Sequence, residues 1–380
     1  MRQFTNNDPR ITGEGNRSLS PHHVNRGDQF NQVSMEPDIL RQDAQTEISN
    51  ERPTVISLEI HENKLAIVGA IIPFSVLGVL IRIGLQRLET YPGAPVFGLV
   101  YAQWVGCFIM GIAVENKNAI HKWYLPLQIG LSSGLCGSIT TFSSWQLDIF
   151  KGFSNYYFNP HTRGYNILDA ISQLLVTMAI SFNGFVFGQH AGHLVEWLVK
   201  KISPTKVCKE EIKIIPRGFA LDYLSAPDYS VIGFGILCWL GVIFAAIFTQ
   251  KQKELALACV FAPVGALLRW YLSFYNIYRA QRFPLGTFIA NIFGTAVLAA
   301  LALSQSGPVM TSISCTVVQA LADGFCGCLT TISTFMVELK GLSLRRSYVY
   351  GITTVVIAQC LMFIILGPYI WTKGVNQMCI

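Results

Sequence analysis

Charged side chains are scarce in this sequence of 380 residues. Lys, Arg, Asp and Glu make up 13% of it, about half the ~25% usual in soluble domains. Residues 1–62 carry 16 of the 50 charges, so the remaining 318 residues carry only 34, while 51% of the chain is hydrophobic. So few charges cannot cover a water-soluble surface, which excludes a soluble globular protein.

Other absences exclude other classes of protein. Residues 1–62 lack the short apolar core of a signal peptide, so we expect the first membrane helix to direct insertion. The ten cysteines are an ordinary number for this length and lie mostly inside apolar runs, which argues against a disulfide-built secreted protein. The sequence has no P-loop, nucleophile elbow or paired intramembrane carboxylates. We therefore expect no enzyme, and the solitary Asp169 and Asp323 argue against a proton-coupled pump without excluding one.

Apolar runs long enough to cross a bilayer recur along the rest of the chain. A spanning helix needs ~20 mostly apolar residues. The sequence predicts an all-α integral membrane protein with nine transmembrane helices, near residues 65–85, 95–114, 123–147, 166–189, 231–249, 255–275, 284–304, 309–337 and 347–370. We expect residues 1–62 to be a disordered cytoplasmic tail and residues 371–380 to be a short C-terminal tail.

The basic residues indicate the orientation of the chain in the membrane. They lie at the ends of apolar runs, so the isoelectric point of 8.7 does not indicate nucleic-acid binding. Thirteen Lys and Arg fall in the loops that are cytoplasmic if the N-terminus is inside, against five in the opposite loops. The positive-inside rule therefore predicts a cytoplasmic N-terminus and, with nine spans, an extracellular C-terminus.

Three segments of the first half recur in the same order in the second half. Residues 76–82 match 263–269, residues 97–106 match 285–294, and residues 136–145 match 326–335. The sequence therefore predicts two four-helix repeats, residues 63–199 and 251–370, joined by residues 200–250, which hold a basic loop and one linker helix. Because that single helix inverts the second repeat, functional sites are expected near the midplane where the repeats meet.

Gly and Thr cluster in the middle of the third and eighth runs. The segment 137–141 in the first repeat matches 327–331 in the second. Such residues permit a helix interruption where the freed backbone groups are buried in protein or face a polar cavity. They also allow close helix packing, which is common in membranes. Two interruptions that meet at a two-fold axis would gather backbone carbonyls, which suits a central cation.

Polar side chains in other runs are candidates to line an ion path. Asn291 has Thr287 one helical turn before it, and the first repeat has Gln103 in place of Asn291. Thr177 and Ser181 form a polar stripe on an otherwise apolar helix. Hydrogen bonding between helices is the alternative interpretation of these residues.

The charged and ionisable residues near the ends of the apolar runs allow more than one interpretation of their position or role. Arg82 and Arg269 occupy matching places in the two repeats, which favours a position facing the protein interior or a vestibule over snorkelling to the interface. We expect them to line a vestibule, where their charge would concentrate anions. His190, His193 and Glu196 have a spacing seen in metal ligands, but a solvated helix end is the favoured interpretation.

The duplicated motifs resemble the fluoride channels, called Fluc or CrcB in bacteria and FEX in fungi and plants. The resemblance rests on G-A-x-x-R at residues 265–269, G-T-x-x-x-N-x-x-G at 286–294 and G-x-x-T-T-x-S-T-F at 327–335. It covers residues ~64–370 and implies the fungal form, a monomer with an internal pseudo-dimer in the lipid bilayer, whose bacterial counterparts are antiparallel homodimers with two pores.

The resemblance implies roles for individual residues. Its structural sodium ion would be held by the backbone carbonyls of four residues, Gly137, Thr140, Gly327 and Thr330. Asn291 matches the pore amide of the family. The family's paired phenylalanine rings match Phe142 and Phe335 in one pore. In the other pore, Ile332 and Trp145 stand in their places.

These departures predict one competent and one vestigial pore. The competent pore is expected to contain Asn291, Phe142, Phe335, Thr287, Thr177 and Ser181. The vestigial pore is expected to contain Gln103, Ile332 and Trp145. The alignment of the last span leaves open whether Tyr348 or Tyr350 faces a pore.

The sequence therefore predicts a passive, fluoride-selective channel that exports fluoride ion from the cytosol across the plasma membrane and protects against its toxicity. One alternative is a proton- or cation-coupled anion exporter. The other is a non-transporting membrane scaffold, in which the Gly and Thr clusters only pack helices.

Overall fold

The computed structural model describes residues 56–155, 164–202, 210–216, 219, 224–276, 282–306 and 311–374. All of them belong to one compact unit, Pro53–Ile380. The expected tail lies outside the described residues up to residue 55, as does the C-terminal tail after residue 374.

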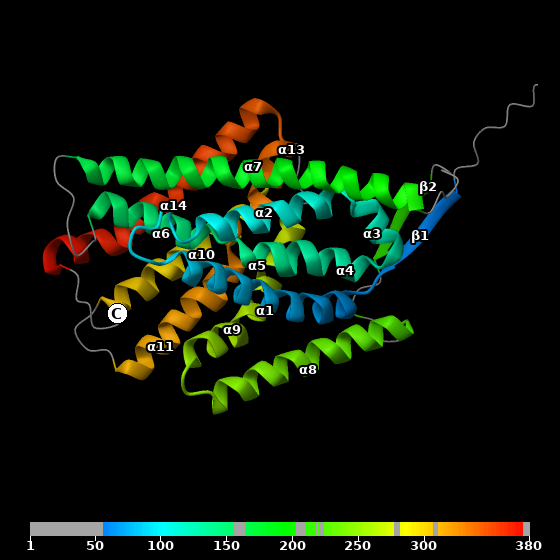
Figure 1. Ribbon diagram of the computed structural model, residues 1–380, viewed down its shortest axis with the longest axis horizontal. Helices are drawn as coiled ribbons and strands as arrows, with labels where there is room; N and C mark the ends of the chain where they lie inside the picture. The colour runs from blue at the N-terminus through cyan, green and yellow to red at the C-terminus, as the bar shows by residue number, and fades with distance from the viewer. Residues whose placement is uncertain are drawn as a thin grey trace, which may run out of the picture. The chain divides into compact units, whose positions relative to one another are not determined.

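Helices make up most of the described chain (Figure 1). The elements up to residue 202 are β1 (Ile56–Glu62), α1 (Lys64–Glu89), α2 (Val100–Glu115), α3 (Lys117–Trp123), α4 (Leu125–Ile129), η1 (Gly130–Cys136), α5 (Gly137–Ile139), α6 (Phe142–Ser154) and α7 (Tyr165–Ile202). The later elements are β2 (Glu210–Pro216), α8 (Ala226–Phe248), α9 (Lys253–Ser273), η2 (Phe274–Asn276), α10 (Leu285–Gln305), α11 (Ser312–Leu321), η3 (Ala322–Cys326), α12 (Gly327–Leu329), α13 (Ser333–Gly341) and α14 (Leu344–Lys373).

Seven helical segments among the described residues are long and apolar enough to cross a bilayer. They are α1, α7, α8, α9 with η2, α10, the segment from α11 to α13, and α14. Of the two other expected spans, α2 has only 16 residues, and the run 123–147 is divided into the short pieces α4 to α6. The structure is that of an integral membrane protein, and the count of nine spans stays a prediction.

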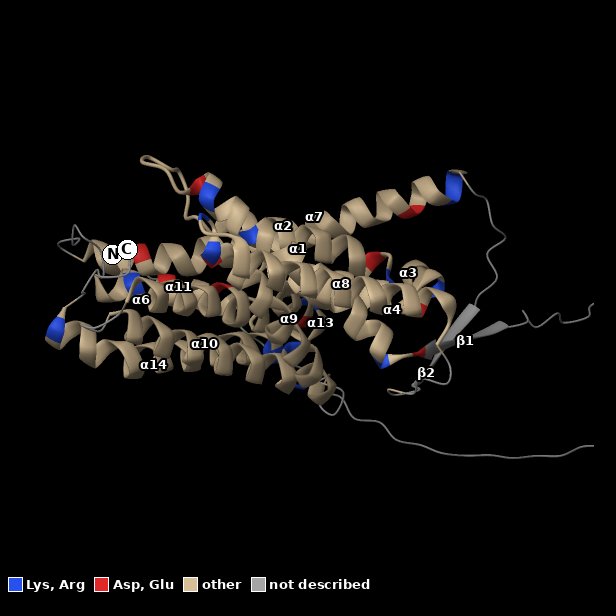
Figure 2. Cartoon of the chain, turned by 90° about the horizontal axis from the view of Figure 1, so that it is seen from below, with Lys and Arg blue, Asp and Glu red and all other residues tan. Residues whose placement is uncertain are grey.

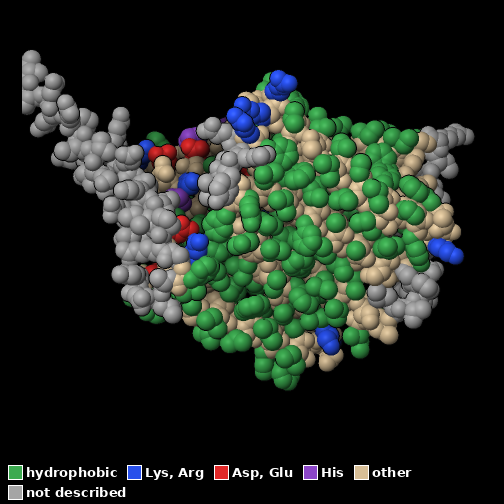
Figure 3. All heavy atoms as spheres, turned by 180° about the vertical axis from the view of Figure 1, so that it is seen from behind, with side chains coloured by type: hydrophobic (Ala, Val, Ile, Leu, Met, Phe, Trp, Pro, Cys, Tyr) green, Lys and Arg blue, Asp and Glu red, His purple; other side chains and the backbone are tan. Residues whose placement is uncertain are grey.

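The distribution of side chains fits a bilayer. Figure 2 shows Lys, Arg, Asp and Glu mostly toward the ends of the helices, and Figure 3 shows a face that is largely hydrophobic. In the most apolar stretch of helix α8, only 11% of the residues are buried inside the protein. Side chains such as Phe234, Leu237 and Phe244 are exposed. Exposed apolar surface of this extent is typical of a helix that faces lipid or another protein.

Two short strands are an addition to the all-α expectation. β1 pairs in parallel with β2, with Ile56 opposite Glu210 and Glu62 opposite Pro216. The apolar residues Ile56, Leu58 and Ile60 alternate with polar ones, the period of a strand. The end of the expected tail and part of the basic loop are thus joined by strand pairing, which a search for helical runs overlooks.

Candidate ion pathway at two interrupted helices

Two helical segments are interrupted at matching positions. In each, a short helix follows a π-helical stretch, η1 or η3, and ends at a threonine in extended conformation. Thr140 has φ −91° and ψ 147°, and Thr330 has φ −92° and ψ 152°. A new helix, α6 or α13, begins two or three residues later. The Gly and Thr clusters therefore mark true breaks rather than only tight packing.

Each break caps the helix that follows the other break. The Thr140 Oγ1 atom accepts hydrogen bonds from the backbone amides of Ile332 and Ser333, at 3.3 and 3.1 Å. The Thr330 Oγ1 atom accepts from the amides of Phe142 and Ser143, at 3.2 and 3.1 Å. The first amides of a helix have no partner inside it and need such an acceptor. The two segments therefore stabilise each other's helices reciprocally.

Gln103 and Asn291 hold the extended residues after the breaks. The Gln103 amide bonds Thr141 twice, with Nε2 donating to its carbonyl at 2.7 Å and Oε1 accepting from its N–H at 3.3 Å. The Asn291 amide bonds Thr331 in the same way, at 3.3 and 2.9 Å. Both amides are completely buried. The sequence suggests that these two positions differ between the repeats, but the structure gives them the same contacts.

The breaks free the four carbonyl groups that the resemblance assigns to a sodium ion. In an unbroken helix, the carbonyls of Gly137 and Thr140 would accept from the amides four residues later. Those amides instead donate to Gln103 Oε1 and Thr141 Oγ1. In the second segment, the amides of Thr331 and Thr334 donate to Asn291 Oδ1 and Thr331 Oγ1, which frees the carbonyls of Gly327 and Thr330. Neutral oxygen donors suit a hard cation, so these residues fit the ion.

Arg82 and Arg269 reach across to the opposite break. Arg82 Nη2 donates to the carbonyl of Asp323 in η3, and Arg269 Nη2 donates to the carbonyl of Ser133 in η1. The side chains are 1% and 5% exposed. Both guanidinium groups therefore lie inside the protein, where each donates one N–H to a carbonyl of a π-helical stretch, and the vestibule position stays a prediction. A sodium ion held here would lie near two fixed positive charges.

Gly137 and Gly327 leave the room that the two guanidinium groups occupy. A Cβ atom on Gly137 would overlap the guanidinium of Arg269, and one on Gly327 would overlap that of Arg82. We expect Gly137→Ala to lower stability by about 1–3 kcal/mol through overpacking, measured as thermal unfolding of the purified protein. Gly84→Ala is the matched control, because no atom lies within 4 Å of its added methyl group. An equal effect of both substitutions would contradict the close contact.

The aromatic residues of the two expected pores lie in one cluster. The rings of Phe142 and Phe335 are 5.7 Å apart and nearly perpendicular, at 71°. The Trp145 ring also contacts Phe142, at 5.5 Å and 81°. Ile332 is buried in the same cluster. The structure thus brings Phe142 and Phe335 together as expected, but it does not separate them from Trp145 and Ile332.

The polar stripe on α7 faces the interior. Thr177 is 2% exposed and Ser181 is completely buried. The Ser181 hydroxyl lies beside the Cys107 thiol and has no other hydrogen-bond partner among the described residues. A buried hydroxyl with spare capacity is available to a passing ion.

Glu338 is a candidate site residue that the sequence does not single out. Its carboxylate accepts hydrogen bonds from Thr287 Oγ1 at 2.5 Å, from Asn276 Nδ2 at 3.1 Å and from the Tyr350 hydroxyl at 2.7 Å. In the sequence, Glu338 directly follows the eighth apolar run, a position typical of an ordinary helix end. Its spacing could have indicated a role at the site, because Glu338 lies three residues after Phe335 and therefore on the same helix face.

The same network includes one of the two tyrosines of the last span, and which of them faces a pore stays a prediction. Tyr350 is completely buried and its ring lies 5.2 Å from that of Phe335, whereas Tyr348 is 63% exposed. Tyr350 is therefore the one that joins the candidate site.

A cavity lies against one side of the breaks. It has a volume of about 290 Å³. Its lining includes Ser144, Asp148, Gln305, Gln319 and Asp323, but neither of the two buried arginines. Ser144 follows the first break directly, so water in this cavity can approach the interrupted helices.

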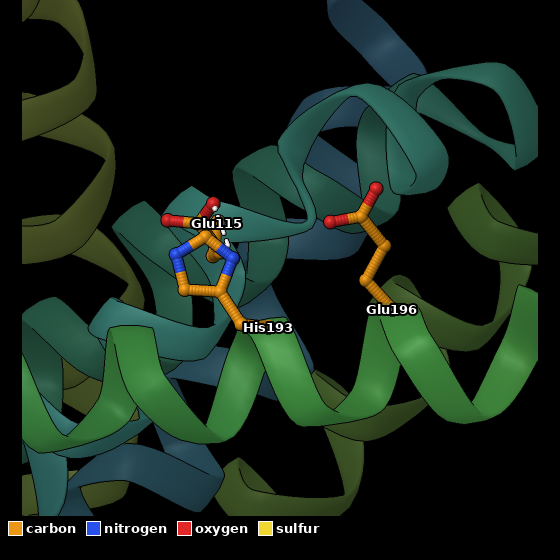
Figure 4. A group of neighbouring side chains, drawn as sticks. All are labelled: Glu115, His193 and Glu196. Atoms are coloured by element: carbon orange, nitrogen blue, oxygen red, sulfur yellow. Dashed lines mark ion pairs between the residues drawn. The ribbon is translucent and has the colours of Figure 1, made fainter.

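The sequence spacing of His190, His193 and Glu196 on α7, for which a solvated helix end is the favoured interpretation, does not bring all three residues into one group. His193 and Glu196 lie together with Glu115 of α2, while His190 is outside the group (Figure 4).

Comparison with known proteins gives consistent matches over both repeats. The family model described as CrcB-like protein, Camphor Resistance (CrcB), matches residues 69–189 and again 256–368. Fluoride export protein 1 of Neurospora crassa is 32% identical over 372 residues, which cover 83% of this chain and 68% of that protein. Fluoride export protein 1 of Saccharomyces cerevisiae is 30% identical over 80% of this chain and 94% of its own length.

A bacterial relative matches about a third of this chain. Fluoride-specific ion channel FluC 1 of Streptococcus pneumoniae is 38% identical over 113 residues, which cover 30% of this chain and 93% of that protein. No solved structure matches the chain. Because the family model matches most of the chain in two separate segments, the chain belongs to the CrcB family.

Proposed function

We propose that this protein is a fluoride channel that exports fluoride ion from the cytosol. The observation that carries the proposal is the pair of reciprocally capped breaks, with the Phe142 and Phe335 rings beside them, in a CrcB-family chain. Its relatives are named fluoride export proteins and fluoride-specific ion channels. The protein is therefore a transporter rather than an enzyme.

The candidate pathway suits a small, strongly hydrated anion. Thr, Ser and Asn offer N–H and O–H donors without a fixed charge, so a fluoride ion can shed water without being held too tightly to leave. The edges of aromatic rings are electropositive and can solvate an anion in the ring plane. A narrow passage of this kind excludes larger halides by width, as other filters combine size with field strength.

We infer that one of the two possible pores is competent. Asn291, Thr287, Thr177, Ser181 and the two phenylalanines would line it, and the contact between Phe142 and Phe335 supports this assignment. Gln103, Ile332 and Trp145 would belong to the vestigial pore. The hydrogen bond from Thr287 to Glu338 and the burial of Tyr350 support polar side chains at the entrance to the competent pore.

The test of function is fluoride efflux from liposomes that contain the purified protein. A channel releases fluoride when the membrane potential is relieved by a potassium ionophore, whereas a scaffold releases none. Chloride-loaded liposomes are the control for selectivity. Fluoride retention by liposomes with correctly folded protein would contradict the proposal.

A coupled exporter is the second candidate, and Glu338 is the observation that favours it. A partly buried carboxylate beside the candidate pore can bind a proton in exchange for a fluoride ion. The reversal potential separates the two: for a channel it follows the fluoride gradient alone, and for a proton-coupled exporter it also shifts with the pH gradient.

We expect Glu338→Gln to reduce fluoride efflux by about 10- to 100-fold. Thr287 and Asn276 both donate to Oε1, and the Tyr350 hydroxyl donates to Oε2. The amide replaces one of these oxygens with an N–H₂ donor and removes the negative charge, so at least one of the three donors loses its acceptor, and hydrogen bonds to a charged group contribute ~1.5–3 kcal/mol. The control is Asp148→Asn at the matching position of the first repeat, where Asp148 pairs with Lys151. A large loss of efflux in the control and none in Glu338→Gln would contradict a pore on the Glu338 side.

We propose nine spans in two inverted repeats, with the N-terminus in the cytoplasm, the C-terminus outside and the plasma membrane as the location. The crossed contacts of Thr140 with Ser333 and of Thr330 with Ser143 support two related halves. Cysteines introduced at Lys117 and Arg345 should react with impermeant reagents from the same side of the membrane. Reaction from opposite sides would overturn the inverted arrangement.

The four freed carbonyls support a structural sodium ion, which would tie the two breaks together. We expect the thermal stability of the purified protein to fall when Na⁺ is replaced by a bulky organic cation, and to recover with Na⁺ in a saturable way. Equal stability in both buffers would contradict a sodium site.

A further inference from the structure

A second polar cluster lies where α2 ends beside α7. Glu115 is the last residue of α2, and His193 and Glu196 lie three residues apart on α7, so both face the same side of that helix. One ligand atom from each of the three side chains lies within 4.8 Å of the other two (Figure 4). This cluster plays no part in the proposed ion path.

Close helix packing fixes the position of Glu115. A Cβ atom on Gly192 would lie 2.7 Å from Glu115 Cβ, so only glycine permits this approach. The neighbouring Asn116 donates its side-chain amide to the Gly192 carbonyl at 3.2 Å. The close packing of α2 against α7 at Gly192 therefore brings Glu115 next to the helix face that carries His193 and Glu196.

The donor set is one imidazole and two carboxylates. His193 Nδ1 lies 3.3 Å from Glu115 Oε1. The Glu196 carboxylate forms an ion pair with Lys200 at 2.7 Å. Imidazole with carboxylates suits Zn²⁺ and related divalent transition metals, whereas Ca²⁺ and Mg²⁺ prefer oxygen ligands alone.

The cluster is open to ions in solution. The side chains of His193 and Glu196 are 62% and 45% exposed, and that of Lys200 is 64% exposed. The Lys200 ammonium can therefore swing away when a cation takes its place beside Glu196.

We propose that Glu115, His193 and Glu196 bind one divalent transition-metal ion of the Zn²⁺ class, with water completing its coordination. The bound ion ties the end of α2 to α7. Because α2 carries Gln103 and α7 carries Thr177 and Ser181, such a tie restrains two helices of the candidate ion path. The binding itself does not depend on what the protein transports.

The test is calorimetric titration of the purified full-length chain with Zn²⁺, after removal of any polyhistidine tag. We expect saturable binding of one ion per chain. His193→Ala and Glu196→Gln should each weaken binding at least about tenfold, since even residues that only orient ligands change affinity by about 10- to 100-fold. His190→Ala is the matched control, an exposed histidine one helical turn away, and should leave binding unchanged.

Three results would overturn the proposal. One is the absence of saturable Zn²⁺ binding, and another is wild-type affinity in His193→Ala. The third is Ca²⁺ binding as tight as that of Zn²⁺, which would indicate an acidic patch only. Fluoride efflux measured on the same variants shows that they are folded and separates failure of this site from failure of the transport function.

Discussion

Asn291→Asp is expected to reduce fluoride efflux about a thousandfold. The substitution keeps the shape of the side chain but replaces its N–H donor, which bonds the Thr331 carbonyl at 3.3 Å, with an acceptor. The new carboxylate also places a fixed negative charge beside the path of an anion. Two like charges 4 Å apart repel by about 4 kcal/mol at an effective dielectric constant of 20, and this corresponds to about a thousandfold in rate. Initial rates of efflux from liposomes measure the effect.

Gln103→Glu is the matched control for Asn291→Asp. Gln103 makes the same pair of hydrogen bonds to Thr141 that Asn291 makes to Thr331, so both variants lose the same kind of support at a break. If the competent pore contains Asn291, we expect both variants to lose stability while Gln103→Glu loses less than about tenfold in efflux per folded protein. Equal losses of efflux would mean that both amides are only structural. A greater loss in Gln103→Glu would reverse the assignment of the two pores.

Thr330→Val is expected to cause a large loss of stability. Valine has the shape of threonine but leaves the amides of Phe142 and Ser143 without the acceptor that they have at 3.2 and 3.1 Å. Each buried unpaired amide costs about 1–3 kcal/mol, so the two together cost about 2–6 kcal/mol. Thermal unfolding of the purified protein should show a midpoint lower by about 5 °C or more.

The position of the destabilised residues distinguishes the loss of a cap on α6 from a local effect of Thr330→Val on α13. Because Thr330 caps α6 and not its own α13, we expect faster hydrogen exchange at residues 142 and 143, which are far away in the sequence. Thr330→Ser keeps the hydroxyl and should leave that exchange unchanged. Faster exchange confined to α13 would contradict reciprocal capping.

Much of the fold follows from composition and repetition. The low charge of the chain and its long apolar runs predict a helical membrane protein, and seven of those runs are helices able to span a bilayer. The repeated Gly and Thr clusters predict the two interruptions, which the structure places at Thr140 and Thr330. The pairing of Phe142 with Phe335 was implied by the family resemblance, and the two rings are in contact. Composition and local pattern are sufficient for the apolar runs and the Gly and Thr clusters because those signals depend on residues that are close in sequence.

Other parts could not be predicted because they depend on which helices meet. A sequence pattern cannot tell whether an arginine faces a vestibule or donates to a carbonyl more than a hundred residues away, as Arg82 and Arg269 do. In the sequence, Glu338 occupies the place of an ordinary helix end, and only the tertiary structure brings its three donors around it. The strands β1 and β2 could not be predicted because they pair across more than a hundred residues.

Hydropathy and repetition are properties of the chain alone, so they are enough to establish an apolar, duplicated membrane protein. How the two halves support each other depends on the tertiary structure. There each threonine caps the opposite helix, and each arginine crosses to the opposite π-helical stretch, because buried amides and carbonyls freed by a helix break must find partners wherever packing supplies them.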